Sequence, residues 1–244
     1  MEDQAGRPSA KHSQAPGPVT SLDDPRAVQI LSTEHWSLLS ARSLAYNEAF
    51  TRGGMFLTFL SMSFVALALL AQAMSFGEQF LTIAAIVLGF DFVIGVTTYG
   101  RIVGANEDDL RAVHGMARIR HAYTEIAPLV GRYFTSPTND DIDSVLTTYG
   151  TQRGSDFVYA FTTSGGMIGL ITAMVGGVLA SVVALLFGAS GDLSIGIGVG
   201  GAVLVLAAIV RLSFGRVAST QEGLSAMFPA ARSEPSRESG DSDS

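Results

Sequence analysis

The chain of 244 residues is 48% hydrophobic and 15% charged, whereas soluble globular domains carry about 25% charged residues. It contains no cysteine, which excludes disulfides, thiolate catalysis and cysteine-based metal sites. The net charge of −7 argues against nucleic acid as the main partner. The positive mean hydropathy of +0.35 indicates a membrane protein instead.

The first segment, residues 1–24, is polar and rich in proline and glycine, and it lacks the apolar core of a signal peptide. We expect it to be disordered, because it cannot bury enough apolar area to offset its conformational entropy. Asp24 and Pro25 then indicate a helix start, with an N-cap residue followed by proline. We predict an amphipathic cytoplasmic helix at 25–52, in which Trp36, the only tryptophan, anchors at the headgroup level.

Four apolar stretches are long enough to cross a bilayer, since about 20 residues of helix span its hydrocarbon core. They lie at 54–74, 80–100, 165–188 and 193–210. Short links join the first two and the last two, which predicts two helical hairpins. The fold class is therefore predicted to be all-α, a polytopic membrane protein with four transmembrane helices. A soluble helical fold is the alternative, but uncharged stretches of about 18 residues or more are rare there.

This prediction divides the chain into six parts. They are a disordered tail (1–24), an amphipathic cytoplasmic helix (25–52), a first transmembrane hairpin (53–100), a helical cytoplasmic segment (101–159), a second transmembrane hairpin (160–212) and a cytoplasmic C-terminal tail (213–244), of which 231–244 is expected to be disordered.

The basic residues set the expected orientation. All fifteen Lys and Arg residues lie in 1–52, in 101–159 or from 211 onward. The short links carry only the acidic Glu78 and Asp192. Because cytoplasmic loops hold the excess of Lys and Arg, we expect a multi-pass protein of the cell (inner) membrane with both termini in the cytoplasm.

The segment after the second span predicts a helix of its own. The span should end near Gly104, and Asn106 should cap a new helix whose first turn is acidic, where the helix dipole favours anions. Apolar residues then repeat with 3-4-3 spacing, which is typical of a helical seam. This seam in helix 107–134 is the candidate surface for a cytoplasmic partner or for helix 25–52. Its residues are Met116, Ile119, Tyr123 and Ile126.

Pro128 should break that helix. A second short helix is expected from Thr138 to about Tyr149, with Asp140 and Asp141 in its first turn. The acidic residues here resemble the start of a calcium loop, but the required glycine and glutamate are missing, so helix capping explains them better.

Asp91 is the only charged residue near the middle of a predicted span. A charge at the bilayer centre costs about 2.5–3.5 kcal/mol, so such residues face a bundle interior and often mark ion or proton paths. Ser61 and Ser63 should lie at the same depth, which makes these three residues the intramembrane functional candidates. Asp91 either binds or relays a cation or proton, or is a hydroxyl-bonded carboxyl that fixes helix packing.

The last two spans are rich in glycine at spacings typical of close helix contact. Packing within the chain is the simpler interpretation, and a homo-oligomer stays open because four short spans leave little room for a pore in one subunit. The predicted packing positions are Gly165, Gly169, Gly176, Gly177, Gly196, Gly200 and Gly201.

Catalytic and metal-binding patterns are weak. His114, His121 and Glu125 share a helix face, but they form no zinc motif, and an i,i+4 pair between His121 and Glu125 is the simpler interpretation. We assign no catalytic residue, no metal and no cofactor. An enzyme would have only Asp91 and the two histidines to work with.

Three blocks carry a family resemblance: ILSTEHWSLLSARSLAYNEAFTRGGMFLTFLSMSFVALALL at 30–70, DDLRAVHGMARIRHAY at 108–123 and NDDIDSVLTTYG at 139–150. They resemble a family of uncharacterised bacterial integral membrane proteins of the actinobacterial type. The resemblance implies a membrane location and carries over no activity and no site residue. A looser likeness, in architecture alone, is to two-span bacterial membrane effectors linked to nucleotide signalling in defence.

Two functions follow from these observations. The first is an oligomeric ion or proton conduit or transporter subunit that uses Asp91. The second is a non-catalytic membrane scaffold or signalling component that acts through helix 107–134. The expected partners are the lipid bilayer, a second copy of the chain or a cytoplasmic protein.

Overall fold

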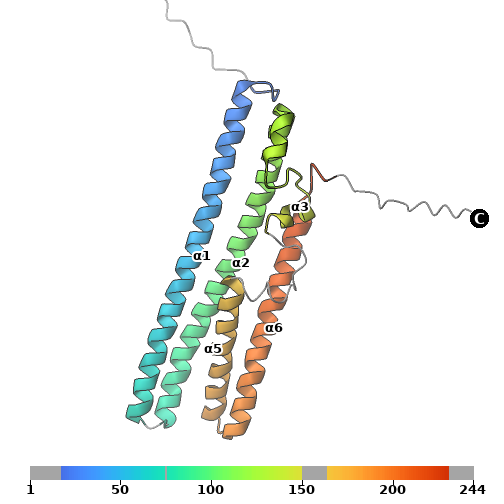
Figure 1. Ribbon diagram of the computed structural model, residues 1–244. Coiled ribbons are helices and arrows are strands. Elements are labelled where there is room, and N and C mark those ends of the chain that lie inside the picture. Colours follow the sequence, from blue (N-terminus) through green and yellow to red (C-terminus); the bar gives the residue numbers. More distant parts are fainter. Residues whose placement is uncertain (1–17, 75, 150–163, 231–244) are drawn as a thin grey trace, which may run out of the picture.

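The computed structural model describes residues 18–74, 76–149 and 164–230 of the chain. Within them every regular element is a helix (Figure 1): α1 (Pro25–Met74), α2 (Glu78–Ile126), the 3₁₀ helix η1 (Pro128–Tyr133), α3 (Ile142–Thr147), α5 (Ser164–Leu186) and α6 (Gly191–Gly223). The predicted all-α class is confirmed for these residues. The segments predicted to be disordered lie outside them at 1–17 and 231–244.

The helices α1 and α2 extend far beyond the spans predicted within them. They contain 50 and 49 residues, so each is about 75 Å long at a rise of about 1.5 Å per residue. The predicted helix boundary at Gly104 and Asn106 is wrong, since both residues lie inside α2. Proline is absent from α2 and occurs in α1 only at its first residue. A cap worth about 1 kcal/mol does not outweigh the backbone hydrogen bonds that a break would lose.

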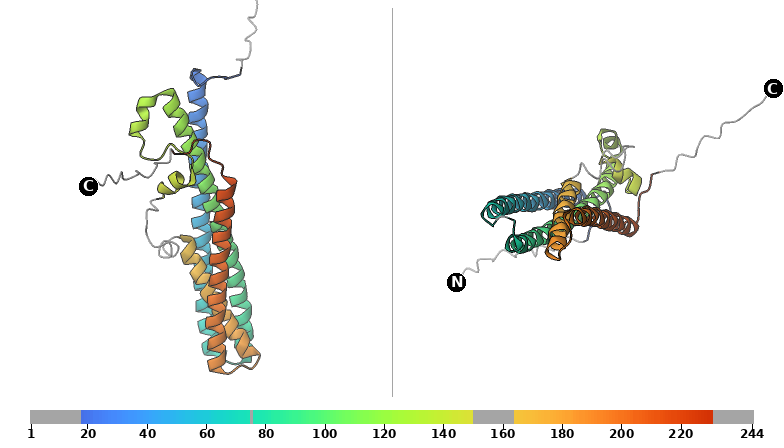
Figure 2. Two further views of the ribbon diagram at one scale, coloured as in Figure 1. Left: turned by 90° about the vertical axis from the view of Figure 1, so that its right-hand side faces the viewer. Right: turned by 90° about the horizontal axis from the view of Figure 1, so that it is seen from below.

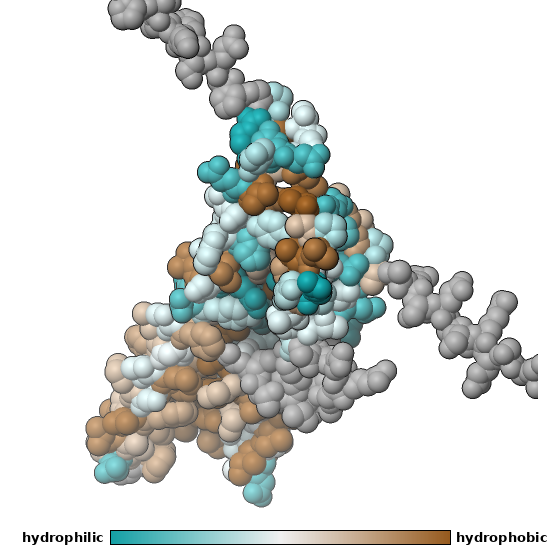
Figure 3. All heavy atoms as spheres, turned by 45° about the horizontal axis from the view of Figure 1, so that its top comes forward, coloured by the Kyte–Doolittle hydropathy of each residue, from teal (hydrophilic) through white to brown (hydrophobic). Residues whose placement is uncertain are grey.

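Each of α1, α2, α5 and α6 contains a stretch long and apolar enough to cross a membrane. Large apolar side chains on these stretches are exposed, among them Phe59, Phe90 and Leu204. Figure 3 shows that hydrophobic atoms cover the lower end of the bundle, whereas hydrophilic atoms gather toward the opposite end. These are the properties of a multi-pass membrane protein, whose apolar surface is covered by lipid.

The four long helices lie side by side (Figures 1 and 2). Helix α1 packs against α2, and α5 packs against both α2 and α6. Three helices meet most closely at Gly95 of α2. A Cβ there would lie 2.6 Å from Oγ1 of Thr172 in α5 and 3.1 Å from the ring of Phe56 in α1. The surrounding core is apolar and includes Phe56, Leu60, Leu67, Phe80, Leu88, Ile168 and Val175.

Glycines allow α5 and α6 to approach closely. A Cβ at Gly177 would lie 2.6 Å from the backbone oxygen of Gly198 and 2.7 Å from Cβ of Ala202. Gly169 and Gly176 make similar room for side chains of α2 and α6, Gly165 faces α2, and Gly201 faces Ala180. Gly196 and Gly200 require a correction, since a Cβ at either would meet no heavy atom within 4 Å. The face of α6 that contacts α5 includes Gly198 and Gly201. Gly196 and Gly200 lie on a different face of α6.

A second core lies in the charged half of the bundle, which we define as residues 25–52, 101–149 and 211–230. Leu110, Val113 and Met116 of α2 pack there against Val145 of α3. Leu38 of α1 and Leu224, the residue after α6, pack against the same cluster. Helix α6 ends at Gly223, so it extends about ten residues into the segment predicted to be the C-terminal tail, 213–244. Helix α2 ends just before Pro128, as predicted.

The short helix α3 begins at Ile142 rather than at Thr138, because Asp141 is its N-cap. The Asp141 carboxylate accepts a hydrogen bond from the backbone N–H of Ser144 at 3.1 Å. The capping role predicted for the acidic residues of this segment is therefore confirmed at Asp141, one turn later than expected. A similar cap starts α1, where Oδ1 of Asp24 accepts from the backbone N–H of Arg26 at 2.9 Å.

Candidate functional site

Asp91 lies in the apolar half of the bundle and is only 2% exposed. Ser63 of α1 donates a hydrogen bond from its hydroxyl to Oδ1 of Asp91 at 3.0 Å. Oδ2 of Asp91 is buried without a hydrogen-bond partner among the residues that the structure describes. Ser61 is exposed and donates instead to the backbone oxygen of Leu57. Of the two predicted serines, only Ser63 reaches Asp91, because two residues rotate an α-helix by about 200°.

This arrangement limits the chemistry of Asp91. One carboxyl group and one hydroxyl group supply too few oxygens for a hard cation such as calcium, which takes about 6–8. Across the described ranges, no three His, Cys, Asp or Glu residues are grouped to hold a metal. Asp91 can take up or release a proton, and it can fix α1 against α2 through Ser63. Both interpretations from the sequence therefore remain proposals.

The carboxylate of Asp109, in the charged half, is buried and accepts hydrogen bonds from three residues. Arg42 of α1 donates from Nε to Oδ1, and Tyr46 of α1 donates from its hydroxyl to Oδ2 at 3.0 Å. Tyr149, which follows α3, donates to the same Oδ2 at 2.6 Å. We call these four residues the Asp109 cluster. The cluster joins α1, α2 and the segment after α3 through one side chain.

Electrostatics keep the members of the Asp109 cluster in the form that this network needs. Burial raises the pKa of Tyr149, and its hydrogen bond to Asp109 raises that pKa further. Burial and the nearby Asp109 charge also raise the pKa of Tyr46. Burial alone would lower the pKa of Arg42, but the attraction of Asp109 outweighs it and the pKa is raised. Both hydroxyls therefore remain donors at neutral pH, and the guanidinium remains charged.

Sequence reasoning assigned Asp109 to a helix first turn and missed this role. A signal was present in the pattern of α2. Residues three, four or seven positions from Asp109 include Ile102, Ala105, Val113 and Met116, all of which are buried. An acidic residue in the middle of an apolar helix stripe indicates a paired buried carboxylate. Its partners were not visible, because Arg42 and Tyr149 lie far away in the sequence.

A second buried carboxylate, Asp140, holds the segment that follows α6. Its two oxygens accept from the backbone N–H groups of Met227 at 2.9 Å and Phe228 at 2.7 Å. Arg118 of α2 donates from Nε to Asp140 at 2.7 Å and from Nη2 to the backbone oxygen of Ser225 at 2.6 Å. We call the contact of Arg118 and Asp140 with residues 225–228 the C-terminal clasp.

Neighbouring residues reinforce the C-terminal clasp. Asp141 accepts from the backbone N–H of Ala230 at 2.9 Å, in addition to capping α3. The ring of His121 stacks on Phe228 with centroids 4.0 Å apart. The predicted pair of His121 with Glu125 is also present, at 3.5 Å. The sequence predicts the caps and the pair but gives no sign that residues 225–230 pack against this loop.

His114 does not join His121 in a site. It is buried, and its Nε2 lies 3.7 Å from Oδ2 of Asp140. Burial and the charge of Arg118 lower the pKa of His114, although Asp140 acts in the opposite direction. His114 is therefore neutral at pH 7, and it lies beside Asp140 of the clasp.

The predicted partner surface on α2 requires a correction. Met116 and Ile119 are buried within the chain, and Tyr123 and Ile126 are half-buried. Met116 packs in the second core, which also includes Val145 of α3 and Leu38 of α1. This face of α2 therefore packs in part against helix 25–52, one of the two alternatives expected from the sequence, and Tyr123 and Ile126 remain partly exposed.

Comparison of the chain with protein-family models, with curated proteins and with solved structures finds no match. Function is therefore argued from the site alone.

We predict that Asp140→Asn loosens the C-terminal clasp. The amide lacks the charge that Arg118 and the two backbone N–H groups bind, and hydrogen bonds to charged groups contribute about 1.5–3 kcal/mol each. Hydrogen exchange of the Met227 and Phe228 amides should accelerate by about 10- to 100-fold. Asp143→Asn is the matched control, since Asp143 is exposed in the first turn of α3. Equal exchange in the two variants would contradict the clasp.

The same clasp should resist acid. Burial raises the pKa of Asp140, but the backbone N–H groups and Arg118 outweigh burial and hold the pKa below the ordinary value of 3.8. Because the folded pKa lies below the unfolded one, the carboxylate stabilises the clasp above pH 3.8 and loses this effect as the pH falls through the folded value. Protection of the two amides should therefore persist from neutral pH down to about 4.

Proposed function

We propose that the chain is a multi-pass protein of the cell (inner) membrane, with two transmembrane hairpins and with both termini and the charged half in the cytoplasm. The distribution of charge supports this orientation. Arg42, Arg101 and Arg211 belong to the charged half, whereas the links at the opposite end carry only Glu78 and Asp192. Cytoplasmic segments of membrane proteins hold such an excess of arginine.

Within the membrane, the function that the geometry supports best is a non-catalytic scaffold or signalling component. One observation carries this proposal: α1 and α2 run unbroken from the apolar half into the charged half, where the Asp109 cluster ties them together. Each helix exceeds the hydrocarbon thickness by about 40 Å or more. A conduit needs only the part inside the bilayer, whereas a scaffold needs a rigid part that stands outside it.

We propose a new contact surface on this cytoplasmic part, because Met116 and Ile119 are already buried. Trp36 is 65% exposed, Leu44 is 70% exposed and Leu129 of η1 is 72% exposed. Trp36 lies 18 residues before the first predicted span, which is about 27 Å along α1, so it lies beyond the headgroup position expected from the sequence. Leu129 lies on η1, beyond the end of α2, and is likewise far from the apolar stretch of α2. Tryptophan is among the residues that most often anchor protein contacts.

Site-specific photo-crosslinking in living cells tests the scaffold proposal. A photoreactive amino acid in place of Trp36 or Leu129 should form protein adducts, because these positions face water and a partner. The same amino acid in place of Phe59, exposed on the apolar half of α1, is the control and should react with lipid. An adduct at twice the mass of the chain identifies a second copy, and any other mass identifies a different partner. The proposal fails if Trp36 and Leu129 yield no protein adduct.

A second candidate function is an ion or proton conduit or transporter subunit that assembles as a homo-oligomer. The unpartnered Oδ2 of buried Asp91 favours it, since a buried polar atom without a partner is rare in native structures. Asp91→Asn should abolish proton flux in proteoliposomes that carry a pH gradient, and Ser63→Ala should alter the flux. Ser61→Ala is the control, because Ser61 does not contact Asp91. Proteoliposomes that stay tight at every pH would exclude this function.

A further inference from the structure

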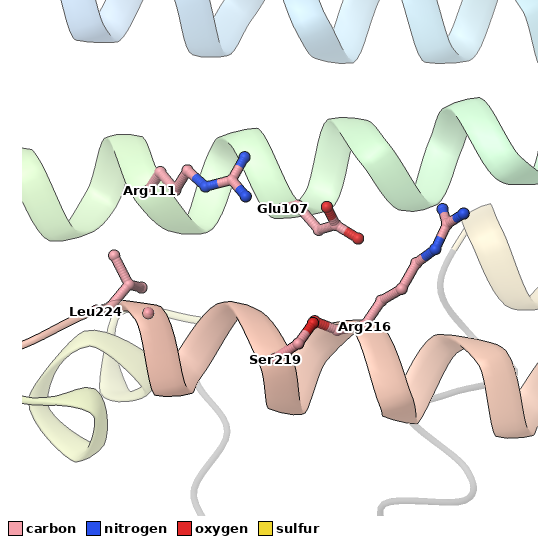
Figure 4. Close-up of a pocket in the computed structure, with 6 residues that line it drawn as sticks. Glu107, Arg111, Arg216, Ser219 and Leu224 are labelled. Atoms are coloured by element: carbon pink, nitrogen blue, oxygen red, sulfur yellow. The ribbon is translucent and has the colours of Figure 1, made fainter.

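A cavity of about 390 Å³ opens between α2 and α6 in the charged half. Figure 4 shows its walls. Glu107 and Arg111 come from successive turns of α2, and Arg216 and Ser219 come from the facing side of α6. Gly223, the last residue of α6, and Leu224, which follows it, also line the cavity. Four of its six lining residues are charged or carry a hydroxyl group.

The charges in the cavity are arranged as two cations on either side of an anion. Arg111 and Arg216 extend from opposite walls, and the carboxylate of Glu107 lies between them (Figure 4). Arg111 forms an exposed ion pair with Asp108 at 3.2 Å. In the parts of the chain that the structure describes, neither Glu107 nor Arg216 has an ion-pair partner. The guanidinium of Arg216 and the carboxylate of Glu107 thus face this space without an ion-pair partner among the described residues, and the guanidinium of Arg111, paired with Asp108, lies beside them.

Packing contacts place this cavity at the charged end of the membrane spans. Gly165, the first residue of the third candidate span, faces Ile102 and Asn106 of α2. Ser213, the last residue of the fourth candidate span, is hydrogen-bonded to Tyr99 of α2. Asn106 directly precedes Glu107, so the cavity begins where the spans end.

The depth of Arg216 agrees with the headgroup layer of the bilayer. Arg216 follows Ser213 by three residues, which is about 4.5 Å along the helix. The headgroup layer is about 5–7 Å thick on each side of a bilayer. Leu212, one helical turn before Arg216, is exposed and apolar. A ligand held at Arg216 can therefore lay hydrocarbon chains over Leu212.

We propose that the cavity binds a phosphate ester that carries an amine, the chemistry of a phosphatidylethanolamine headgroup. Arg111 and Arg216 bind the phosphate oxygens, since guanidinium groups recognise phosphate through paired hydrogen bonds. The carboxylate of Glu107 binds the ammonium group. It repels a phosphate ester that has no ammonium group, because both are negatively charged. Ser219 donates its hydroxyl proton to the backbone oxygen of Arg216 at 2.9 Å, so the lone pairs of that hydroxyl are left to accept from the ammonium.

Titration of the purified full-length protein in detergent tests this site. The probes are dioctanoyl phosphatidylethanolamine, dioctanoyl phosphatidylglycerol and free phosphoethanolamine, with binding measured by calorimetry. We expect saturable binding of the ethanolamine lipid and at least about tenfold weaker binding of the glycerol lipid, because the glycerol headgroup has no ammonium group for Glu107 to bind. Arg216→Gln and Arg111→Gln should each weaken the ethanolamine lipid by about tenfold or more.

Two further variants sharpen the test. Glu107→Gln should remove the preference for the ethanolamine lipid over the glycerol lipid. Arg132→Gln is the matched control, since Arg132 is exposed on η1 outside the cavity, and it should bind as the native chain does. Circular dichroism and elution volume verify that each variant is folded, which the exposed positions of Arg111 and Arg216 favour.

The outcomes separate the source of the ligand from the existence of the site. Free phosphoethanolamine that binds as tightly as the lipid, and loses binding in Arg216→Gln, supports the site and identifies a soluble ligand. Tighter binding of the lipid supports a membrane headgroup. Equal affinity for the two lipids in the native chain, or undiminished binding in both arginine variants, would overturn the proposal.

Discussion

The buried carboxylate of Asp109 is the interaction on which the charged half of this protein depends. It accepts hydrogen bonds from Arg42 and Tyr46 of α1 and from Tyr149 beyond α3, so three segments that are distant in the sequence meet at one group. Another ion pair between α1 and α2, Glu48 with Arg101 at 2.7 Å, is exposed and screened by water and salt. Loss of one partner from a buried pair costs about 3–5 kcal/mol, because the other charge is left uncompensated.

The apolar half and the charged half of the bundle are held together by different interactions. In the apolar half, small residues at Gly95 and Gly177 let helices approach, and lipid covers the outward side chains. In the charged half, buried carboxylates at Asp109 and Asp140 join segments that hydrophobic packing alone would leave loosely connected. The continuous helices α1 and α2 link the two halves, which is the basis of the scaffold proposal. The cavity lined by Arg216 lies in the charged half, close to the ends of the third and fourth candidate spans.

Much of the fold could be predicted from the sequence, because uncharged stretches of fixed length report directly on membrane-spanning helices. The rotation of each helix could not. The sequence places Ser61 and Ser63, or Gly200 and Gly201, at the same depth, but tertiary packing decides which one faces a neighbour. The false boundary at Asn106 has a related cause, since a capping residue is a weak local preference and α2 buries one face through that point. The return of residues 225–230 to Asp140 had no local signal.

Comparison of Arg42→Gln with Arg52→Gln in the full-length protein tests the central role of Asp109 most directly. Both changes remove one positive charge from α1, but Arg52 pairs with Glu48 at the surface, whereas Arg42 binds the buried carboxylate. The measurement is hydrogen exchange of the backbone amides of residues 25–50 and of Tyr149. Arg42→Gln should accelerate exchange in both regions, while Arg52→Gln should leave it close to that of the native chain. Unchanged protection in Arg42→Gln would contradict the account.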